Sequence, residues 1–181
     1  MTNEEFHLLK YPIGELNIPQ NSTSQQISEW INEIEQFPEA VVALTKNLSN
    51  EQLNWIYRPE GWTIKQVVHH CSDSHMNSLI RFKLALTEDM PTIKPYYEDR
   101  WAKLVDGNSN DLNYSLMLLK GLHAKLVILL RSLTPNDLKR QYIHPEHGKR
   151  FSLEQTIYIY AWHSKHHLAH IKQALKHKGE F

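Results

Sequence analysis

Hydrophobic residues recur at steps of three to four positions in four long stretches of the chain, and this spacing is typical of amphipathic helices. The first stretch begins near Ser24. Its apolar positions are Ile27, Trp30, Ile31, Ile34, Val41, Val42 and Leu48. Pro38 lies inside the stretch and is expected to bend or divide the helix, because proline lacks an N–H and clashes with the preceding turn.

Two of the other stretches open with a capping box, in which a Ser or Thr is followed three residues later by Gln. Thr63 and Gln66 open a helix that should end near residues 87–89, and Ser152 and Gln155 open one that should end at Gly179. A leucine stripe over residues 110–133 predicts the remaining helix. Four long amphipathic helices predict an all-α four-helix bundle in a single domain, residues 1–181.

The segments between these helices are shorter or irregular. The first twenty residues contain two prolines and a glycine and are expected to form an irregular arm. Residues 91–108 are long for a plain connection and rich in aromatics, so they either cover a cleft or pack on the bundle surface. Residues 134–137 predict a short helical turn, and residues 141–151 predict a hairpin-like excursion.

Composition narrows the classes of function. The chain has 181 residues with 20 Lys and Arg against 20 Asp and Glu, so its net charge is near zero. This balance argues against nucleic acid or an anionic membrane as a partner. No apolar run approaches the roughly 18 residues of a membrane span, and the beginning of the chain is unlike a signal peptide. Cys71 is the only cysteine, which excludes an internal disulfide. We therefore expect a cytoplasmic protein.

The chain has 12 histidines, and eight of them fall in two predicted helices. The last helix contains two pairs spaced by four residues, His163 with His167 and His166 with His170. Residues four apart share a helix face, and imidazole is a common ligand of zinc and similar metals. At 100° per residue, His167 lies roughly 70° and His163 roughly 110° from the centre of the apolar stripe. The other pair lies roughly 130–170° away, which predicts surface or supporting positions.

A third ligand has to come from another helix, and the predicted helix after Thr63 offers His69, His70 and His75. Helical phase alone favours His75, which falls within the apolar stripe. The alternative is that these histidines are ordinary polar residues. No His-Glu-x-x-His motif occurs, and Glu-x-x-His occurs only at Glu4 and His7, so a zinc protease or a di-iron carboxylate bundle is not indicated.

Two motifs resemble those of the DinB-like superfamily. In Trp62-Thr63-Ile64-Lys65-Gln66-Val67-Val68-His69-His70-Cys71-Ser72-Asp73, a histidine follows the tryptophan by eight residues and an aspartate follows three later. The second motif is the His-x-x-x-His pair in Ala161-Trp162-His163-Ser164-Lys165-His166-His167-Leu168-Ala169-His170-Ile171. Tyr11-Pro12-Ile13-Gly14 and Asp73-Ser74-His75-Met76-Asn77 resemble the YfiT-type branch, whose members are described as metal-dependent hydrolases. The resemblance spans nearly the whole chain.

The resemblance implies an up-down four-helix bundle that binds one divalent metal ion, zinc first and nickel second, and that usually forms a homodimer. It assigns the ligands to His70, His163 and His167. This agrees with helical phase on the last helix and replaces His75 by His70 on the other. His75 then supports a ligand or lines the pocket, and Asp73 either orients a ligating histidine or is a polar residue of the helix face.

Three neutral ligands leave a coordination position open, as in catalytic zinc sites. A water there could have its pKa lowered to about 7, which favours a hydrolase acting on a small-molecule substrate. Candidates for its general base are His75, Glu98 and Asp99. The same charge could activate a low-molecular-weight thiol, and the resemblance extends to S-transferases, including ones that use bacillithiol. A non-catalytic structural or metal-sensing bundle is the third alternative. Cys71 is expected to be a buried apolar residue.

Overall fold

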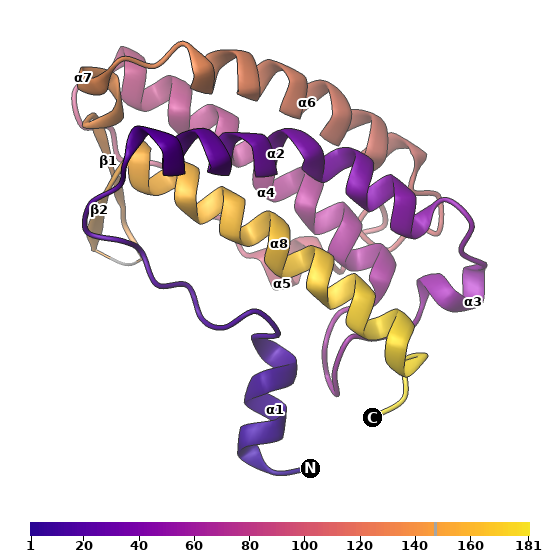
Figure 1. Cartoon of the computed structure of the whole chain (residues 1–181). Helices are drawn as coiled ribbons and strands as arrows, with labels where there is room; N and C mark the ends of the chain where they lie inside the picture. Colours follow the sequence, from indigo (N-terminus) through magenta and orange to yellow (C-terminus); the bar gives the residue numbers. More distant parts are fainter. Residues whose placement is uncertain (147) are drawn as a thin grey trace.

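The computed structural model describes residues 1–146 and 148–181. Its four long helices pack side by side as a bundle, which confirms the predicted fold class (Figure 1). The bundle helices are α2 (Ser24–Thr45), α4 (Ile64–Thr87), α6 (Asn113–Arg131) and α8 (Leu153–His177).

The helices do not simply alternate in direction, as the up-down resemblance implied. Helices α2 and α4 each pack against α6 and α8, so α2 and α4 lie diagonally opposite each other. The long connection after α4 returns along the bundle, and α4 and α6 therefore run in the same direction (Figure 1). Arg140, which follows α6, accordingly donates a hydrogen bond to the Ala85 carbonyl near the end of α4. This arrangement makes α4 and α8 antiparallel neighbours.

The predicted capping boxes are confirmed at both helices. The Thr63 hydroxyl accepts from the Gln66 N–H at 3.4 Å, while the Gln66 side chain accepts from the Thr63 N–H at 3.0 Å. Ser152 and Gln155 make the same reciprocal pair at the start of α8. These boxes satisfy N–H groups that would otherwise have no partner in the first turn. They also determine where the two helices that carry the clustered histidines begin.

Pro38 does not divide the first bundle helix. Helix α2 continues through it from Ser24 to Thr45, contrary to one of the two expected outcomes. Because proline has no N–H, the Ile34 carbonyl four residues earlier loses its helical donor. That carbonyl accepts a hydrogen bond from His123 Nδ1 at 2.6 Å instead. A partner on α6 therefore satisfies the carbonyl inside the bundle.

The beginning of the arm is helical, so the prediction of an irregular segment was wrong for its first half. Helix α1 spans Asn3–Lys10 and is opened by a capping box between Thr2 and Glu5 that the sequence contained. None of its residues is buried. Its position beside α8 therefore depends on a few contacts at its end.

Short elements complete the fold. They are α3 (Asn50–Leu53), α5 (Glu98–Trp101), α7 (Pro135–Leu138), β1 (Gln141–His144) and β2 (Lys149–Ser152). The two strands pair antiparallel with Tyr142 opposite Phe151, which confirms the predicted hairpin. Residue 147 of its predicted span lies outside the described residues. The helical turn expected at 134–137 is α7.

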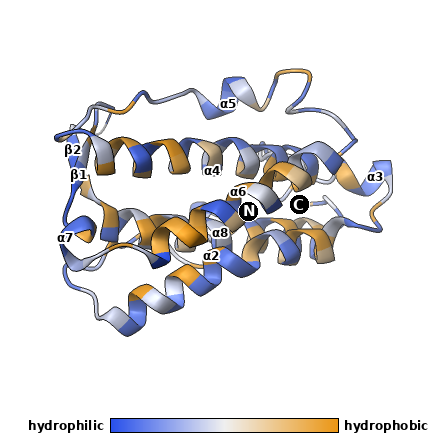
Figure 2. Ribbon diagram, turned by 90° about the horizontal axis from the view of Figure 1, so that it is seen from above, coloured by the Kyte–Doolittle hydropathy of each residue, from blue (hydrophilic) through white to orange (hydrophobic). Residues whose placement is uncertain are grey.

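The apolar core is divided into two clusters. One contains Ile34, Phe82, Leu126 and Ala161, and the other contains Phe37, Cys71, Leu119 and Ile171. In each cluster, the four residues named come from the four bundle helices, one from each, so both clusters involve all four helices. Between the clusters lie His75 on α4, His123 on α6 and His163 and His167 on α8. A layer of histidines thus crosses the bundle. Figure 2 shows how hydrophobic and hydrophilic positions follow one another along the bundle helices.

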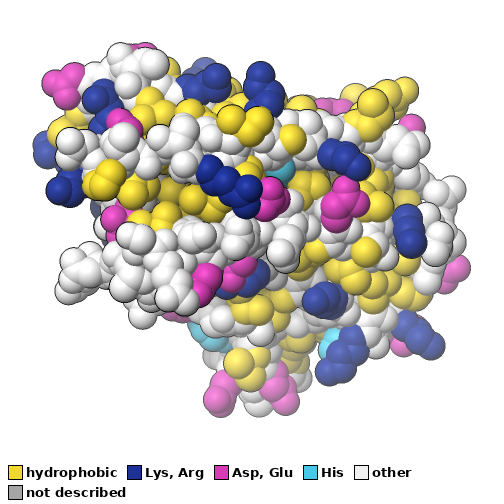
Figure 3. Space-filling model, turned by 45° about the horizontal axis from the view of Figure 1, so that its top comes forward, with side chains coloured by type: hydrophobic (Ala, Val, Ile, Leu, Met, Phe, Trp, Pro, Cys, Tyr) yellow, Lys and Arg dark blue, Asp and Glu magenta, His cyan; other side chains and the backbone are white. Residues whose placement is uncertain are grey.

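Helix α6 is the one described helix that is long and apolar enough to cross a membrane by length and composition alone. In the structure it packs against α2 and α4 as a member of the bundle. It leaves several apolar side chains exposed, including Tyr114, Met117 and Ile128. Hydrophobic and charged side chains of both signs alternate over the face seen in Figure 3.

Candidate metal centre

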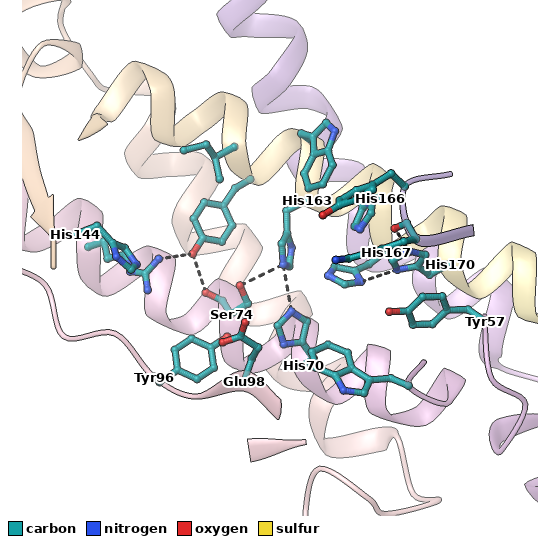
Figure 4. Close-up of a pocket in the computed structure, with 17 residues that line it drawn as sticks. Tyr57, His70, Ser74, Tyr96, Glu98, His144, His163, His166, His167 and His170 are labelled. Carbon is teal, nitrogen blue, oxygen red and sulfur yellow. Dashed lines mark hydrogen bonds between the residues drawn. The ribbon is translucent and has the colours of Figure 1, made fainter. Parts of the chain in front are cut away.

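Helices α4 and α8 bring together the three histidines that the family motifs marked. His70, His163 and His167 each offer one ring nitrogen, and the three nitrogens lie within 4.8 Å of one another (Figure 4). The Nε2 atoms of His70 and His163 are 3.3 Å apart. Two nitrogens bound to one tetrahedral zinc at about 2.0–2.1 Å lie about 3.3–3.4 Å apart. The spacing therefore suits two ligands of a single ion.

Aromatic packing holds the cluster in place. Trp62, which immediately precedes the capping residue of α4, packs against the His70 ring at a centroid distance of 4.6 Å. The same indole lies parallel to the His167 ring at 6.5 Å. His163 and His167 stand one turn apart on α8 with their ring centroids 4.4 Å apart. One tryptophan thus contacts histidines from both helices.

The three rings are held in the neutral form that binds metal ions. Burial lowers the pKa of His70 to about 4, with a smaller contribution from His166. Burial also holds the pKa values of His163 and His167 well below their usual range, and the neighbouring histidines add to the effect. At neutral pH each ring therefore has one N–H and one lone pair.

His75, which helical phase favoured as a ligand, is not part of the cluster. It is completely buried, as its place in the apolar stripe predicted. Its Nε2 atom lies 3.0 Å from Nδ1 of His163, on the side of that ring away from His70. His75 therefore supports His163 from behind, and His70 occupies the position at the cluster.

His166 and His170 are buried, so a surface position for either was wrong. Tyr57 stacks on the His170 ring at a centroid distance of 3.8 Å, and His170 Nε2 donates to the Lys10 carbonyl at 3.1 Å. His170 Nδ1 lies 3.4 Å from Nδ1 of His167. The arm and the connector before α4 cover this face of α8, which helical phase could not reveal.

A cavity of about 400 Å³ opens beside the cluster. Aromatic residues form much of its wall, with Lys10, Arg81 and Glu98 as charged groups. The aromatic lining residues are Tyr11, Tyr57, Trp62, Tyr96, Tyr160 and Trp162. Because Tyr96 and Glu98 belong to residues 91–108, this connection covers a cleft, which was one of its two predicted roles.

The cavity also contains polar groups that the sequence did not reveal. The Ser74 hydroxyl lies 3.5 Å from His163 Nε2 (Figure 4), and it also interacts with the Tyr96 side chain. Burial raises the pKa of the Tyr96 phenol, so it stays protonated. Among the suggested general bases, Glu98 lines the cavity, whereas His75 and Asp99 do not.

Two neighbours of His70 have other surroundings. In the described part of the chain, the Asp73 carboxylate makes no hydrogen bond to a histidine, so it does not orient a ligand. Burial, and secondarily Asp106, raise its pKa to about 6. Cys71 is fully buried in an apolar cluster, as expected, and burial raises the pKa of its thiol.

The cluster has an open side. Among the described residues, no fourth histidine, cysteine or carboxylate joins His70, His163 and His167. All three line the cavity. Structural zinc sites are closed by four protein ligands, whereas catalytic sites keep a position free. Three ring nitrogens beside a cavity match the open pattern and not the closed one.

A four-helix bundle with an open three-histidine cluster between two of its helices is typical of a class of metal-binding proteins. The sequence model of the DinB superfamily matches residues 33–171, and the chain belongs to this family.

Related proteins match over almost their whole length. A protein of Oceanobacillus iheyensis named "putative metal-dependent hydrolase" is 50% identical over 169 residues, which cover 93% of this chain and 97% of the relative. A Bacillus mycoides protein of the same name is 49% identical over 163 residues, covering 90% and 93%.

The solved structure of YfiT from Bacillus subtilis is described as a probable metal-dependent hydrolase with an unusual four-helix bundle topology. It superposes with a TM-score of 0.92 at 42% identity and covers 95% of this chain and 98% of its own.

Proposed function

We propose that this protein is a metal-dependent hydrolase in which His70, His163 and His167 bind one divalent ion, with zinc preferred over nickel. The observation that carries the proposal is the three-nitrogen cluster with its open side on a cavity of about 400 Å³. The names of the relatives support the same class. A divalent ion in such a site supplies a Lewis acid and lowers the pKa of a coordinated water to about 7.

The polar residues of the cavity suggest how a substrate is held. Arg81 donates a hydrogen bond to the Tyr160 hydroxyl at 3.3 Å, and its side chain lines the cavity. Its positive charge suits a small molecule with an anionic or strongly polar group. Ser74 lies beside His163 and Tyr96 lines the same cavity, so both can offer a hydroxyl donor to a polarised oxygen of the substrate. Glu98 is the carboxylate in the cavity wall that can accept a proton.

The proposal is tested first by metal binding and then by activity. Metal-free protein is titrated with zinc and nickel, and we expect one ion per chain. The loaded protein is then screened against small esters, amides and lactones, with metal-free protein and His163→Ala as controls. Hydrolysis that requires both the metal and His163 supports the proposal.

A parallel screen adds small thiols, including bacillithiol, together with electrophilic substrates. Consumption of the electrophile that requires the thiol would replace the hydrolase by an S-transferase. Stoichiometric metal without either activity would favour a structural or metal-sensing role, and failure to bind metal would contradict all three.

A further inference from the structure

A chain of three hydrogen bonds connects the backbone of α2 with His163. The Ile34 carbonyl accepts from His123 Nδ1 at 2.6 Å. His123 Nε2 lies 2.7 Å from Nδ1 of His75, and His75 Nε2 lies 3.0 Å from Nδ1 of His163. The chain thus crosses the bundle from α2 through α6 and α4 to α8.

The direction of every hydrogen bond follows from the carbonyl, which can only accept. His123 Nδ1 therefore donates to Ile34. A neutral imidazole has one N–H, so His123 Nε2 must accept from His75 Nδ1. By the same step His75 Nε2 must accept from His163 Nδ1. Three neutral rings have three N–H protons, the three bonds use all of them, and the lone pair that remains is on His163 Nε2.

That lone pair points to the cluster, because His163 Nε2 is the atom 3.3 Å from Nε2 of His70. The starting carbonyl is free for His123 because Pro38 provides no N–H for the usual helical bond. We propose that Pro38, His123 and His75 are positioning residues that fix His163 in the Nδ1–H tautomer and so aim its Nε2 lone pair at the metal position. The part of this statement that concerns metal rests on the proposed function.

The residues around these hydrogen bonds restrict the imidazole rings of His75 and His123 to this arrangement. Phe37 stacks on His75 at a centroid distance of 5.2 Å and packs against His123 at 5.5 Å. His75 is 0% and His123 is 2% exposed, so water does not compete for their nitrogens. Burial also lowers the pKa of His123 to about 4, which keeps that ring neutral.

The tautomers can be measured on the metal-free wild-type protein. In long-range ¹H–¹⁵N correlation spectra of histidine-labelled protein, we expect the Nδ1–H tautomer for His75, His123 and His163. An Nε2–H tautomer at His123 or His163 would overturn the proposal. Because the spectra need no metal, this result is independent of whether the protein is a hydrolase.

Zinc affinity, measured by competition with a chromophoric chelator, tests the consequence. Replacing the partner of a ligating histidine typically weakens binding by about 10- to 100-fold. His75 is the direct partner of His163, and His123 acts through it. We therefore expect a loss at the lower end of this range in His123→Phe, with partial recovery in His123→Gln, whose amide can again accept from His75. The matched control is His69→Phe. His69 is another buried histidine of α4 that is bonded at both nitrogens, to Ser115 and Ser109, and it does not contact the cluster.

Pro38→Ala separates positioning from stability. It restores the helical N–H, which competes with His123 for the Ile34 carbonyl, so we expect severalfold weaker zinc binding and a change in the His123 ¹⁵N shifts. Alanine is a better helix former than proline, so the melting temperature should not fall.

Equal affinities of His123→Phe and His69→Phe would contradict the proposal. By contrast, a wild-type protein with the expected tautomers that binds no zinc would contradict the proposed function alone.

Discussion

The two histidines that α8 contributes to the cluster are supported on opposite sides by different parts of the molecule. His163 is backed by His75 and His123 and reaches a carbonyl inside the bundle, over contacts of 3.0, 2.7 and 2.6 Å. His167 is backed by His170 and reaches the Lys10 carbonyl in the arm, over contacts of 3.4 and 3.1 Å. Both supports end on a carbonyl, so both leave Nε2 of the α8 histidine without a proton.

The difference lies in what holds the final carbonyl. The carbonyl of Ile34 belongs to a bundle helix between two apolar clusters. The carbonyl of Lys10 belongs to the last residue of α1, a helix that buries none of its side chains. Segments with few buried contacts open at low free-energy cost. The inner support is thus part of the core, whereas the outer one depends on how well the arm stays docked.

The largest effect on metal binding is expected from replacing the α8 histidines themselves. His163→Ala and His167→Ala should each lose stoichiometric metal and keep most of their helicity, because each removes a ligand without changing the apolar clusters. Metal content after gel filtration and far-ultraviolet circular dichroism measure the two quantities. Stoichiometric metal in either variant would count against the ligand assignment.

Acid should strongly lower the free energy of unfolding, because His70 and His123 are buried as neutral rings. The pKa values of His70 and His123 are about 4 in the folded protein, against about 6.5 in an unfolded chain. Between these values the unfolded state binds more protons, so the free energy of unfolding is retained above pH 6.5 and falls as the pH decreases towards 4. The two residues together should cost about 5 kcal/mol by pH 4.5.

Urea unfolding of the metal-free protein at pH 7.5, 6, 5 and 4.5 measures this loss, and His123→Phe should show a flatter profile. A wild-type stability that does not change between pH 7.5 and 5 would show that these rings are accessible to protons in the folded state.

A smaller effect is expected on the outer side. His170→Ala should retain the metal, as helical phase suggested, but with an affinity severalfold lower because His167 loses its partner. Deleting residues 1–22 removes the Lys10 carbonyl and should weaken zinc binding by a similar factor. Since both changes break one support, combining them should add little. Additive losses in chelator competition would indicate that the arm acts on the site by another route.

The smallest effect is expected at His166. Its ring stacks on Trp162 at 4.3 Å and makes no hydrogen bond to the three clustered histidines among the described residues. His166→Ala should therefore bind zinc like the wild type, although the loss of the buried ring will lower the free energy of unfolding somewhat. Loss of metal in this variant alone would mean that the other face of α8 carries the site.

The sequence predicted the elements better than their surroundings. Capping boxes at Thr63 and Ser152 and the hairpin were confirmed because they depend on neighbours a few residues away. The sequence did not reveal that Pro38 leaves the Ile34 carbonyl free for another donor, since that donor, His123, lies on another helix. His75 was correctly placed in the core, but it lies outside the three-histidine cluster, because helical phase measures burial and not which ring nitrogen meets which partner.

The sequence by itself determined four amphipathic helices, a histidine pair one turn apart on the last of them, and the motif that marks His70. These features follow from the period of the helix and from residue type. Only the tertiary structure decided that α4 faces α8, that a layer of histidines separates two apolar clusters, and that His163 is supported by the core and His167 by the arm. Such contacts join residues up to about 160 positions apart, and their geometry is set by packing among helices and not by the spacing of residues along any one of them.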